Sequence, residues 1–392
     1  MNNRTTAAPY DALRRRTSEK WQAYPDDVLP MFVAEMDFPL APPIRQALAR
    51  AIELGDTGYV ELGDRGVARA FAGYASEAWG WSPDPPRIRT TTDVSVVIVE
   101  SLRRLVRPGE GVVITPPVYP PFFELLPEAG ARVVEVPLTD DGGVFALDLA
   151  GIDSALRDGA RGILLCHPHN PLGLIHPPEQ LVELSRIVAR HDGFVLSDEI
   201  HAPLTHSGAT FTPYLSVSDE ARQHGIAAES GSKAFNLAGL KCAMFVTAGD
   251  PMTALIDSLP AEVSVRTGLF GAIATRIGFT EGRGWLTETV AAIEDNLEVL
   301  RGELARRLPA VRMGRPEAGY LAWLDLSRLG WGEDPAGFAL EKARVALVRG
   351  LDFGDPGAGF ARMNIGCAPE TIVEAVARLA AHAQTAQTAQ DG

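Results

Sequence analysis

The most informative part of this chain places one lysine beside two serines, in the run Ser230-Gly231-Ser232-Lys233-Ala234-Phe235-Asn236-Leu237-Ala238-Gly239-Leu240. An acidic turn precedes it, in Ser197-Asp198-Glu199-Ile200-His201. A lysine amine is mostly protonated at neutral pH because its ordinary pKa is about 10.4, so covalent work requires surroundings that favour the neutral form. Formation of a Schiff base with an aldehyde is the usual work of such a lysine. Lys233 is therefore a candidate for covalent catalysis.

Pyridoxal phosphate is a cofactor whose needs these residue types meet. It supplies an aldehyde, a phosphate that needs N–H and O–H donors, and a pyridine nitrogen that an aspartate can keep protonated. The matching groups are Lys233, the pair Ser230 and Ser232, and Asp198. The Ser-x-Ser-Lys pattern is weak alone, since most surface lysines near serines do nothing. The prediction therefore depends on further parts of the site, in the right order.

Two further parts are present. The first is the turn-rich run Leu165-Cys166-His167-Pro168-His169-Asn170-Pro171-Leu172-Gly173, which follows an apolar run. A strand that ends in Asn-Pro and Gly opens into a loop, and ligands of open α/β sheets bind at such ends. Asn170 can donate its side-chain amide to the phenolic oxygen of the cofactor. The second part is Arg362, whose guanidinium fork matches a substrate carboxylate.

With these motifs in order, the chain resembles the fold-type-I pyridoxal-phosphate enzymes of the class I/II aminotransferase superfamily. Within them it is similar to the MalY/PatB-type cystathionine β-lyases, or C-S lyases, over nearly its whole length. The N-terminal part carries this finer resemblance, in Lys20-Trp21, Val28-Leu29-Pro30-Met31-Phe32-Val33-Ala34-Glu35-Met36-Asp37-Phe38-Pro39, Ala41-Pro42-Pro43-Ile44 and Thr57-Gly58-Tyr59. Plain aminotransferases do not usually share that opening.

The resemblance implies a role for each motif residue. Lys233 would bind the cofactor covalently and, once freed, remove the α-proton of the substrate. Asp198 would pair with the pyridinium, and Asn170 would hold the phenolic oxygen. Arg362 would bind the α-carboxylate of a small amino-acid substrate, with Asn170 and Ala34 beside it.

The phosphate site follows from the same resemblance. Ser230, Ser232 and Lys241 would contact the phosphate. The helix that begins at Val94 and Ser95 would add backbone N–H groups and a favourable dipole.

Four more residues are candidates for the site. Three of them also have a plain structural interpretation, and the fourth would act in the neighbouring subunit. Tyr119 would stack on the cofactor ring, although packing in its proline-rich turn is the alternative. His201 stands where transaminases often carry a tyrosine, and a hydrogen-bonded loop histidine is its alternative. Asp93 is expected to cap the following helix through Val96 and Val97 rather than to touch an anionic phosphate. Tyr59 would reach the phosphate of the neighbouring subunit and join the catalytic set, which implies a homodimer with shared active sites.

Three residues depart from the family pattern. His167 replaces a more typical Ser or Asn, and Arg349 lies where relatives usually have Pro-Gly before an aromatic-Gly pair. Arg266 falls in the segment that approaches the neighbouring subunit in the superfamily. One hypothesis is that Arg349 or Arg266 recognises a second acidic group, or that the site is adapted to an unusual amino acid; surface arginines are the alternative. His167 and His169 lack further ligands at metal-site spacing, so no metal is predicted.

Short apolar runs alternate with helical patterns and predict an α/β fold, a mostly parallel sheet covered by helices on both faces. The runs are 112–115, 133–137, 162–166, 194–197, 226–229 and 243–247, and one intervening helix shows an apolar face at Leu181, Leu184, Ile187 and Val188. Right-handed crossovers would bring Asn170, Asp198 and Lys233 to one edge. We expect a large cofactor-binding domain over 48–282 and a smaller α/β domain from 1–47 plus 283–392.

Composition limits the partners and the compartment. The net charge of −14 disfavours nonspecific binding to nucleic acid or to an anionic membrane. No apolar stretch reaches the roughly 18 residues of a membrane span, and the polar N-terminus lacks a signal core. The three cysteines suggest no disulfide framework. We therefore expect a cytoplasmic enzyme.

Three functions compete on this sequence. The N-terminal signature favours a C-S β-lyase that cleaves L-cystathionine or a related cysteine S-conjugate to thiol, pyruvate and ammonia. The substituted loops favour an aminotransferase or another pyridoxal-phosphate enzyme of specialised amino-acid biosynthesis. A regulatory protein that binds the cofactor is the third, although the complete catalytic set argues against regulation as its only role. Fold and cofactor alone do not decide among them.

Overall fold

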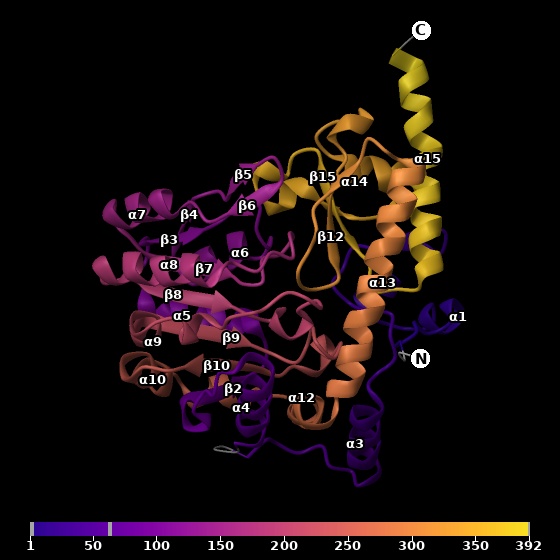
Figure 1. Ribbon diagram of the computed structural model, residues 1–392. Helices are drawn as coiled ribbons and strands as arrows, with labels where there is room; N and C mark the ends of the chain where they lie inside the picture. The colour runs from indigo at the N-terminus through magenta and orange to yellow at the C-terminus, as the bar shows by residue number, and fades with distance from the viewer. Residues whose placement is uncertain (1–3, 62–64, 391–392) are drawn as a thin grey trace.

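The computed structural model describes residues 4–61 and 65–390, with side chains described as far as residue 383. Among these residues, a seven-stranded sheet forms the centre of the larger part of the molecule (Figure 1). Its order is β2 (Ile88–Thr91), β10 (Ala243–Thr247), β9 (Gly225–Glu229), β8 (Phe194–Asp198), β7 (Ala160–Cys166), β3 (Gly111–Ile114) and β4 (Arg132–Glu135). Strand β10 runs antiparallel to both neighbours, and the other pairs are parallel. The predicted mostly parallel sheet is confirmed.

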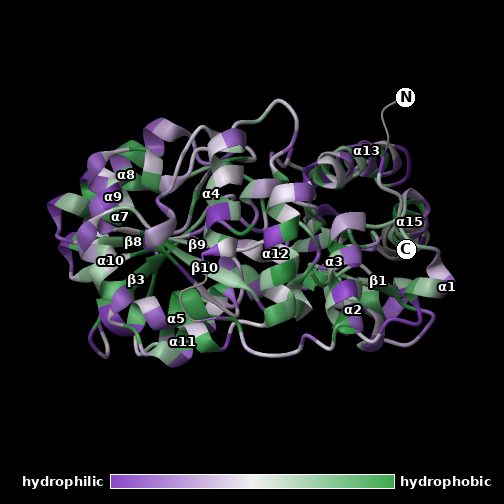
Figure 2. Ribbon diagram, turned by 90° about the horizontal axis from the view of Figure 1, so that it is seen from below, coloured by the Kyte–Doolittle hydropathy of each residue, from purple (hydrophilic) through white to green (hydrophobic). Residues whose placement is uncertain are grey.

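Helices cover both faces of this sheet, as Figure 2 shows with apolar strands between two helical layers. Helices α5 (Val94–Leu105) and α6 (Phe122–Glu128) pack on one face, and α7 (Leu149–Arg157), α8 (Pro178–Arg190) and α9 (Asp219–His224) on the other. Successive strand residues point to opposite faces of the sheet, so Leu164 packs in the core under α5 and α6, and Leu165 packs in the core under α7, α8 and α9. A sheet buried on both faces explains the continuous apolar runs.

Helix α8 shows how the sequence pattern specifies a packed face. Its predicted apolar residues Leu181, Leu184, Ile187 and Val188 are all buried, which confirms the prediction. Pro178 stands at the first helical position, where a missing N–H costs no hydrogen bond. The short strand β2 was not predicted, because its edge sequence Ile88-Arg89-Thr90-Thr91 carries only one large apolar residue.

A second, antiparallel sheet forms the centre of the smaller part, in the order β11 (Arg312–Met313), β12 (Leu321–Asp325), β15 (Phe360–Asn364) and β14 (Val348–Arg349). Helices α13 (Arg283–Arg307) and α15 (Pro369–Gln390) pack against each other beside it (Figure 1). The N-terminal strand β1 (Leu29–Pro30) pairs with β13 (Val345–Ala346), so the start of the chain lies against its C-terminal part. The predicted domains 48–282 and 1–47 plus 283–392 stay a prediction.

Further α-helices and β-strands complete the described part of the chain, beside short 3-10 turns and one π-helical turn. They are α1 (Tyr10–Leu13), α2 (Glu19–Gln22), α3 (Pro42–Glu53), α4 (Gly66–Trp79), β5 (Thr139–Asp141), β6 (Val144–Ala146), α10 (Asp250–Asp257), α11 (Ala261–Val265), α12 (Leu269–Glu281) and α14 (Pro335–Phe338). Within the described ranges, no helix combines the length and apolar character needed to cross a bilayer.

The strand register positions the site. Cys166 at the end of β7 lies beside Asp198 at the end of β8, and Asp198 lies beside Ala228 of β9. The loops that carry Asn170, Asp198 and Lys233 therefore leave the sheet at one edge, as predicted.

Candidate active site

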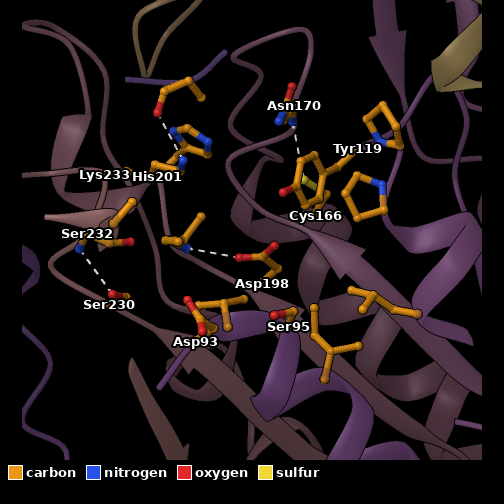
Figure 3. A pocket seen from close by; sticks show the side chains of 18 of the residues that line it. Asp93, Ser95, Tyr119, Cys166, Asn170, Asp198, His201, Ser230, Ser232 and Lys233 are labelled. Carbon is orange, nitrogen blue, oxygen red and sulfur yellow. Dashed lines mark hydrogen bonds between the residues drawn. The ribbon is translucent and has the colours of Figure 1, made fainter. Parts of the chain in front are cut away.

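A pocket of about 350 Å³ opens at this edge of the sheet (Figure 3). It lies between the strand-end loops of the large sheet, the N-terminal segment and the second sheet. Among its lining residues are eleven of the thirteen predicted site residues: Ala34, Val94, Ser95, Tyr119, Asn170, Asp198, His201, Ser230, Ser232, Lys233 and Arg362. The two that do not line it are Tyr59 and Lys241.

Lys233 reaches the pocket from the turn after β9. Its Nζ donates a hydrogen bond to the carbonyl oxygen of Ala34 at 3.0 Å. Burial, together with a smaller contribution from the positive charge of Arg362, lowers the pKa of the Lys233 amine to about 8. A neutral amine is therefore far more accessible here than on a surface lysine, as Schiff-base chemistry requires.

Asp198 is the main buried acid that faces the pocket. Its Oδ1 accepts a hydrogen bond from the backbone N–H of Ile200 at 3.2 Å, which Figure 3 shows as a dashed line. Burial raises the pKa of the Asp198 carboxyl to about 7, because the nearby charge of Lys233 and this hydrogen bond only partly compensate for lost hydration. A cation placed against this carboxylate would restore its ionised form. The protonated ring nitrogen of pyridoxal phosphate is such a cation.

Arg362 and Asn170 are joined directly. Arg362 Nη1 donates to Asn170 Oδ1 at 3.0 Å, and Nη2 donates to the carbonyl oxygen of Phe32 at 3.2 Å. Its buried Nε receives no partner among the described residues, so the guanidinium has a free donor. Because the oxygen of Asn170 is occupied by Arg362, its amide nitrogen is left to donate to a ligand oxygen.

The opposite end of the pocket presents donors suited to a phosphate. Helix α5 begins there, and the N–H groups of Val94 and Ser95 precede the first backbone hydrogen bonds of the helix, which Asp93 accepts. The Ser232 side chain lines the pocket. Ser230 is engaged within the protein, since its hydroxyl donates to the Cys242 carbonyl at 2.7 Å and accepts from the Ser232 N–H at 3.0 Å.

Asp93 is the N-cap residue of helix α5, as predicted, because its backbone carbonyl accepts hydrogen bonds from the N–H groups of Val96 and Val97 at 3.1 Å. Its side chain makes no capping hydrogen bond. The Asp93 carboxylate instead lies 3.2 Å from Lys241 Nζ. Lys241 therefore lies next to a pocket residue without lining the pocket itself.

Tyr119 and His201 both face the pocket, His201 from a buried position and Tyr119 from a partly buried one (Figure 3). Burial raises the pKa of Tyr119 to about 12, with the charge of Asp198 adding to the effect. Burial also lowers the pKa of His201 to about 3, with smaller contributions from the charges of Lys233 and Arg362. Both side chains are therefore neutral at physiological pH, and their roles as cofactor contacts stay predictions.

Tyr59 lies on the surface with 89% of its area exposed. Among the residues that depart from the family pattern, Arg349 pairs with Asp334 at 2.9 Å, outside the pocket. Arg266 is exposed at the end of α11. His167 is fully buried, and its Nε2 lies 3.0 Å from the Thr212 carbonyl oxygen. None of these positions tests the hypothesis of a second acid-binding arginine.

Sequence reasoning missed Tyr320. Its hydroxyl donates to the Ala34 carbonyl oxygen at 2.8 Å, the same oxygen that accepts from Lys233. Two asparagines hold the segment that carries this carbonyl: Asn364 donates to the carbonyls of Val33 and Glu35, and Asn236 pairs with both backbone groups of Met36. Only tertiary structure brings these residues together, so no local sequence signal could have identified them.

These groups fit pyridoxal phosphate on chemical grounds. A lysine amine with a lowered pKa, a buried carboxylate without a full counter-charge, an amide donor and a helix N-terminus surround one pocket. Lys233 would bind the aldehyde carbon, Asp198 the ring nitrogen, Asn170 the phenolic oxygen, and the start of α5 with Ser232 the phosphate.

Comparison with known proteins agrees with this chemistry. Residues 84–379 match the family model described as aminotransferase class I and II. The chain is 39% identical to a Mycobacterium leprae protein provisionally named a cystathionine β-lyase, over 94% of this chain and 95% of that protein. It is 32% identical to the cystathionine β-lyase PatB of Bacillus subtilis, over 91% and 92% of the two chains.

A solved structure supports the fold. Cystalysin from Treponema denticola, whose crystal structure contains pyridoxal 5′-phosphate, superposes with a TM-score of 0.91 over 98% of this chain and 100% of that one, at 24% identity. The match of the family model to most of the chain, together with the similarity to PatB over nearly the full length, shows the family. The chain belongs to the class I and II aminotransferase family of pyridoxal-phosphate-dependent enzymes and, within it, to the MalY/PatB group of cystathionine β-lyases.

Proposed function

We propose that this protein is a pyridoxal-phosphate-dependent C-S β-lyase that cleaves L-cystathionine or a related cysteine S-conjugate. One observation carries the proposal: the relatives that match nearly the whole chain at 32% and 39% identity are named cystathionine β-lyases. The pocket supports it, because it combines a lysine base with an arginine for the α-carboxylate.

The reaction removes the α-proton and the β-thiolate of the substrate and takes up water, giving thiol, pyruvate and ammonia. When bound, pyridoxal phosphate supplies a protonated ring that delocalises the electrons left at the α-carbon. Asp198 would keep that ring nitrogen protonated. Arg362 and Asn170 would hold the substrate carboxylate so that its α-hydrogen faces Lys233.

Lys233 is suited to carry the proton. Because burial lowers the pKa of its amine to about 8, a substantial fraction is neutral near pH 7.5 and can accept a proton. The Ala34 carbonyl oxygen, 3.0 Å from Nζ, would hold the amine near the pocket floor. The same amine, once protonated, can return the proton to the departing thiolate.

The test uses purified holoenzyme and L-cystathionine without any keto acid. The proposal predicts that homocysteine thiol, pyruvate and ammonia appear in equal amounts. Spectral evidence of amino-acid binding without thiol release would contradict it. Amino-group transfer to an added keto acid would then support the aminotransferase alternative. A Lys233→Ala variant distinguishes the third candidate function, a regulatory protein, from the two enzymatic ones. A regulatory protein would keep its cellular effect in this variant although catalysis is lost.

We also propose that the protein is a cytoplasmic homodimer in which Tyr59 completes the neighbouring active site. Three large apolar side chains are unusually exposed within one short segment: Ile52 at 64%, Leu54 at 76% and Tyr59 at 89%. An exposed apolar patch of this kind is typical of an interface.

Subunit mixing tests the shared site. Lys233→Ala and Tyr59→Ala homodimers should each be nearly inactive. Mixed and re-equilibrated in equal amounts, they should recover about a quarter of wild-type activity, because about half of the dimers are hybrids with one intact site. Failure to recover any activity, with hybrid formation shown by mass spectrometry, would contradict the shared site.

A further inference from the structure

Two buried carboxyl side chains lie behind the pocket and take no part in the chemistry described above. Glu199 directly follows Asp198, and Glu229 directly precedes Ser230. Both are fully buried. The backbone N–H of Glu199 donates to the Ala228 carbonyl at 3.0 Å, which fixes the two residues at the ends of neighbouring strands.

Their hydrogen bonds are unequal. Glu199 Oε1 accepts from the Ser197 hydroxyl at 2.8 Å and from the Tyr214 N–H at 2.9 Å. Glu199 Oε2 and both carboxyl oxygens of Glu229 receive no hydrogen bond from any donor in the described part of the chain. The two carboxyl groups lie close enough to share a hydrogen bond if one of them carries a proton. A buried polar atom without a partner is costly, so these oxygens need a proton between them.

The charged groups that act most strongly on the two glutamates are negative. Asp198 faces both glutamates with the same sign of charge. Tyr74 of α4 faces Glu229, and Tyr214 faces Glu199. The Arg283 guanidinium lies over the Tyr74 ring at 5.5 Å. Burial raises the pKa of both carboxyls, and their mutual repulsion raises that of Glu229 further.

We propose that Glu229 is protonated and donates a hydrogen bond to Glu199 Oε2. This hydrogen bond holds the segment that carries Asp198 and the segment that carries Lys233 in fixed positions relative to each other. The assignment of the proton follows from the hydrogen bonds, because the two donors on Glu199 stabilise its ionised form. Glu199 and Glu229 are positioning residues. Their shared proton holds the strand ends of β8 and β9 in register behind the pocket.

The sign of the pH dependence follows from proton linkage. An unfolded glutamate loses its proton near pH 4.5, whereas the folded pair keeps one proton to a much higher pH. Above about pH 5 the folded state therefore holds one proton more than the unfolded state, and stability from this proton is lost as pH rises. The unfolding equilibrium constant should rise about tenfold per pH unit from this source alone.

The test compares Glu229→Gln, Glu229→Ala and the exposed control Glu298→Gln in the holoenzyme. Gln keeps a neutral donor toward Glu199, so it should preserve the visible spectrum of the bound cofactor and kcat/KM within about threefold. Glu229→Ala should lower kcat/KM at least about tenfold, because it leaves Glu199 Oε2 unpaired. In urea unfolding, the unfolding equilibrium constant of wild type should rise relative to that of Glu229→Gln by about tenfold per pH unit between about pH 6 and about pH 8.

Two results would overturn the proposal. One is a pH-independent difference between Glu229→Gln and wild type, equal to that of Glu298→Gln. The other is a loss of kcat/KM in Glu229→Gln as large as that in Glu229→Ala, because the amide would then fail to replace the protonated carboxyl group. The unfolding measurement and the cofactor spectrum do not depend on which substrate the enzyme cleaves, because both are recorded without substrate.

Discussion

Arg362 donates through Nη1 to the side-chain oxygen of Asn170 at 3.0 Å, although 192 residues separate them in the chain. Arg362 belongs to β15 of the second sheet, and Asn170 to the loop after β7 of the first. The guanidinium also lies over the Phe353 ring at 5.2 Å, and burial lowers its pKa to about 10. One buried cation therefore links the two sheets and fixes the orientation of the amide.

Replacement of Arg362 by Lys should impair substrate binding strongly. An ammonium group cannot make the bidentate contact to a carboxylate or keep Asn170 oriented. We expect KM for L-cystathionine to rise about 100-fold or more, equivalent to about 3 kcal/mol. Steady-state kinetics checks this, with the exposed Arg186→Lys as the matched control. An unchanged KM for Arg362→Lys would mean that another group binds the α-carboxylate.

Tyr320→Phe tests the second donor on the Ala34 carbonyl. The variant removes one buried hydrogen bond while Lys233 still satisfies the acceptor, so we expect a loss of about 1 kcal/mol in unfolding free energy. The remaining Lys233 contact should also hold the amine more tightly and lower kcat about tenfold or less. Urea denaturation and kinetics give the two values, with Tyr24→Phe as a control on a partly exposed tyrosine. Wild-type values for both would exclude a positioning role for Tyr320.

Much of this arrangement could be predicted from the sequence because its signals are local. Asp198 and Asn170 each follow an apolar strand directly, and the right-handed crossovers of a parallel sheet bring such ends together. Tyr320 and the side-chain role of Asp93 could not be predicted. Their partners Ala34 and Lys241 are distant in sequence, and only packing determines which polar groups meet.

The buried pair of Lys20 and Asp37 should show strong coupling. Lys20 Nζ lies 2.8 Å from Asp37 Oδ1 and also donates to the Glu35 carbonyl, and both side chains are almost fully buried. Removal of one partner leaves an unpaired buried charge, so Lys20→Met should cost about 3–5 kcal/mol. The double variant Lys20→Met with Asp37→Leu should recover much of that loss. A double-mutant cycle by urea denaturation checks this, and additive single effects would contradict the coupling.

The lowered pKa of Lys233 predicts how the stability of the cofactor-free protein, in which the amine is not bound to the cofactor, changes with pH. Its folded pKa, about 8, lies below the ordinary value of 10.5, so between these values the unfolded chain binds one proton more than the folded protein. Stability from this group therefore rises with pH across that window and is lost as pH falls toward 8.

Buried thiols oppose this trend in the same pH range, because burial raises the pKa of Cys166, Cys242 and Cys367. The informative quantity is thus the difference between wild type and Lys233→Met, in which the thiol contributions cancel. Relative to Lys233→Met, wild type should become more stable as pH rises from about 8 to about 10, by up to about 1.4 kcal/mol per unit. The exposed Lys342→Met should show no such trend against wild type. A flat difference for Lys233→Met would mean that the amine keeps an ordinary pKa in the folded protein and that burial does not prepare it for covalent chemistry.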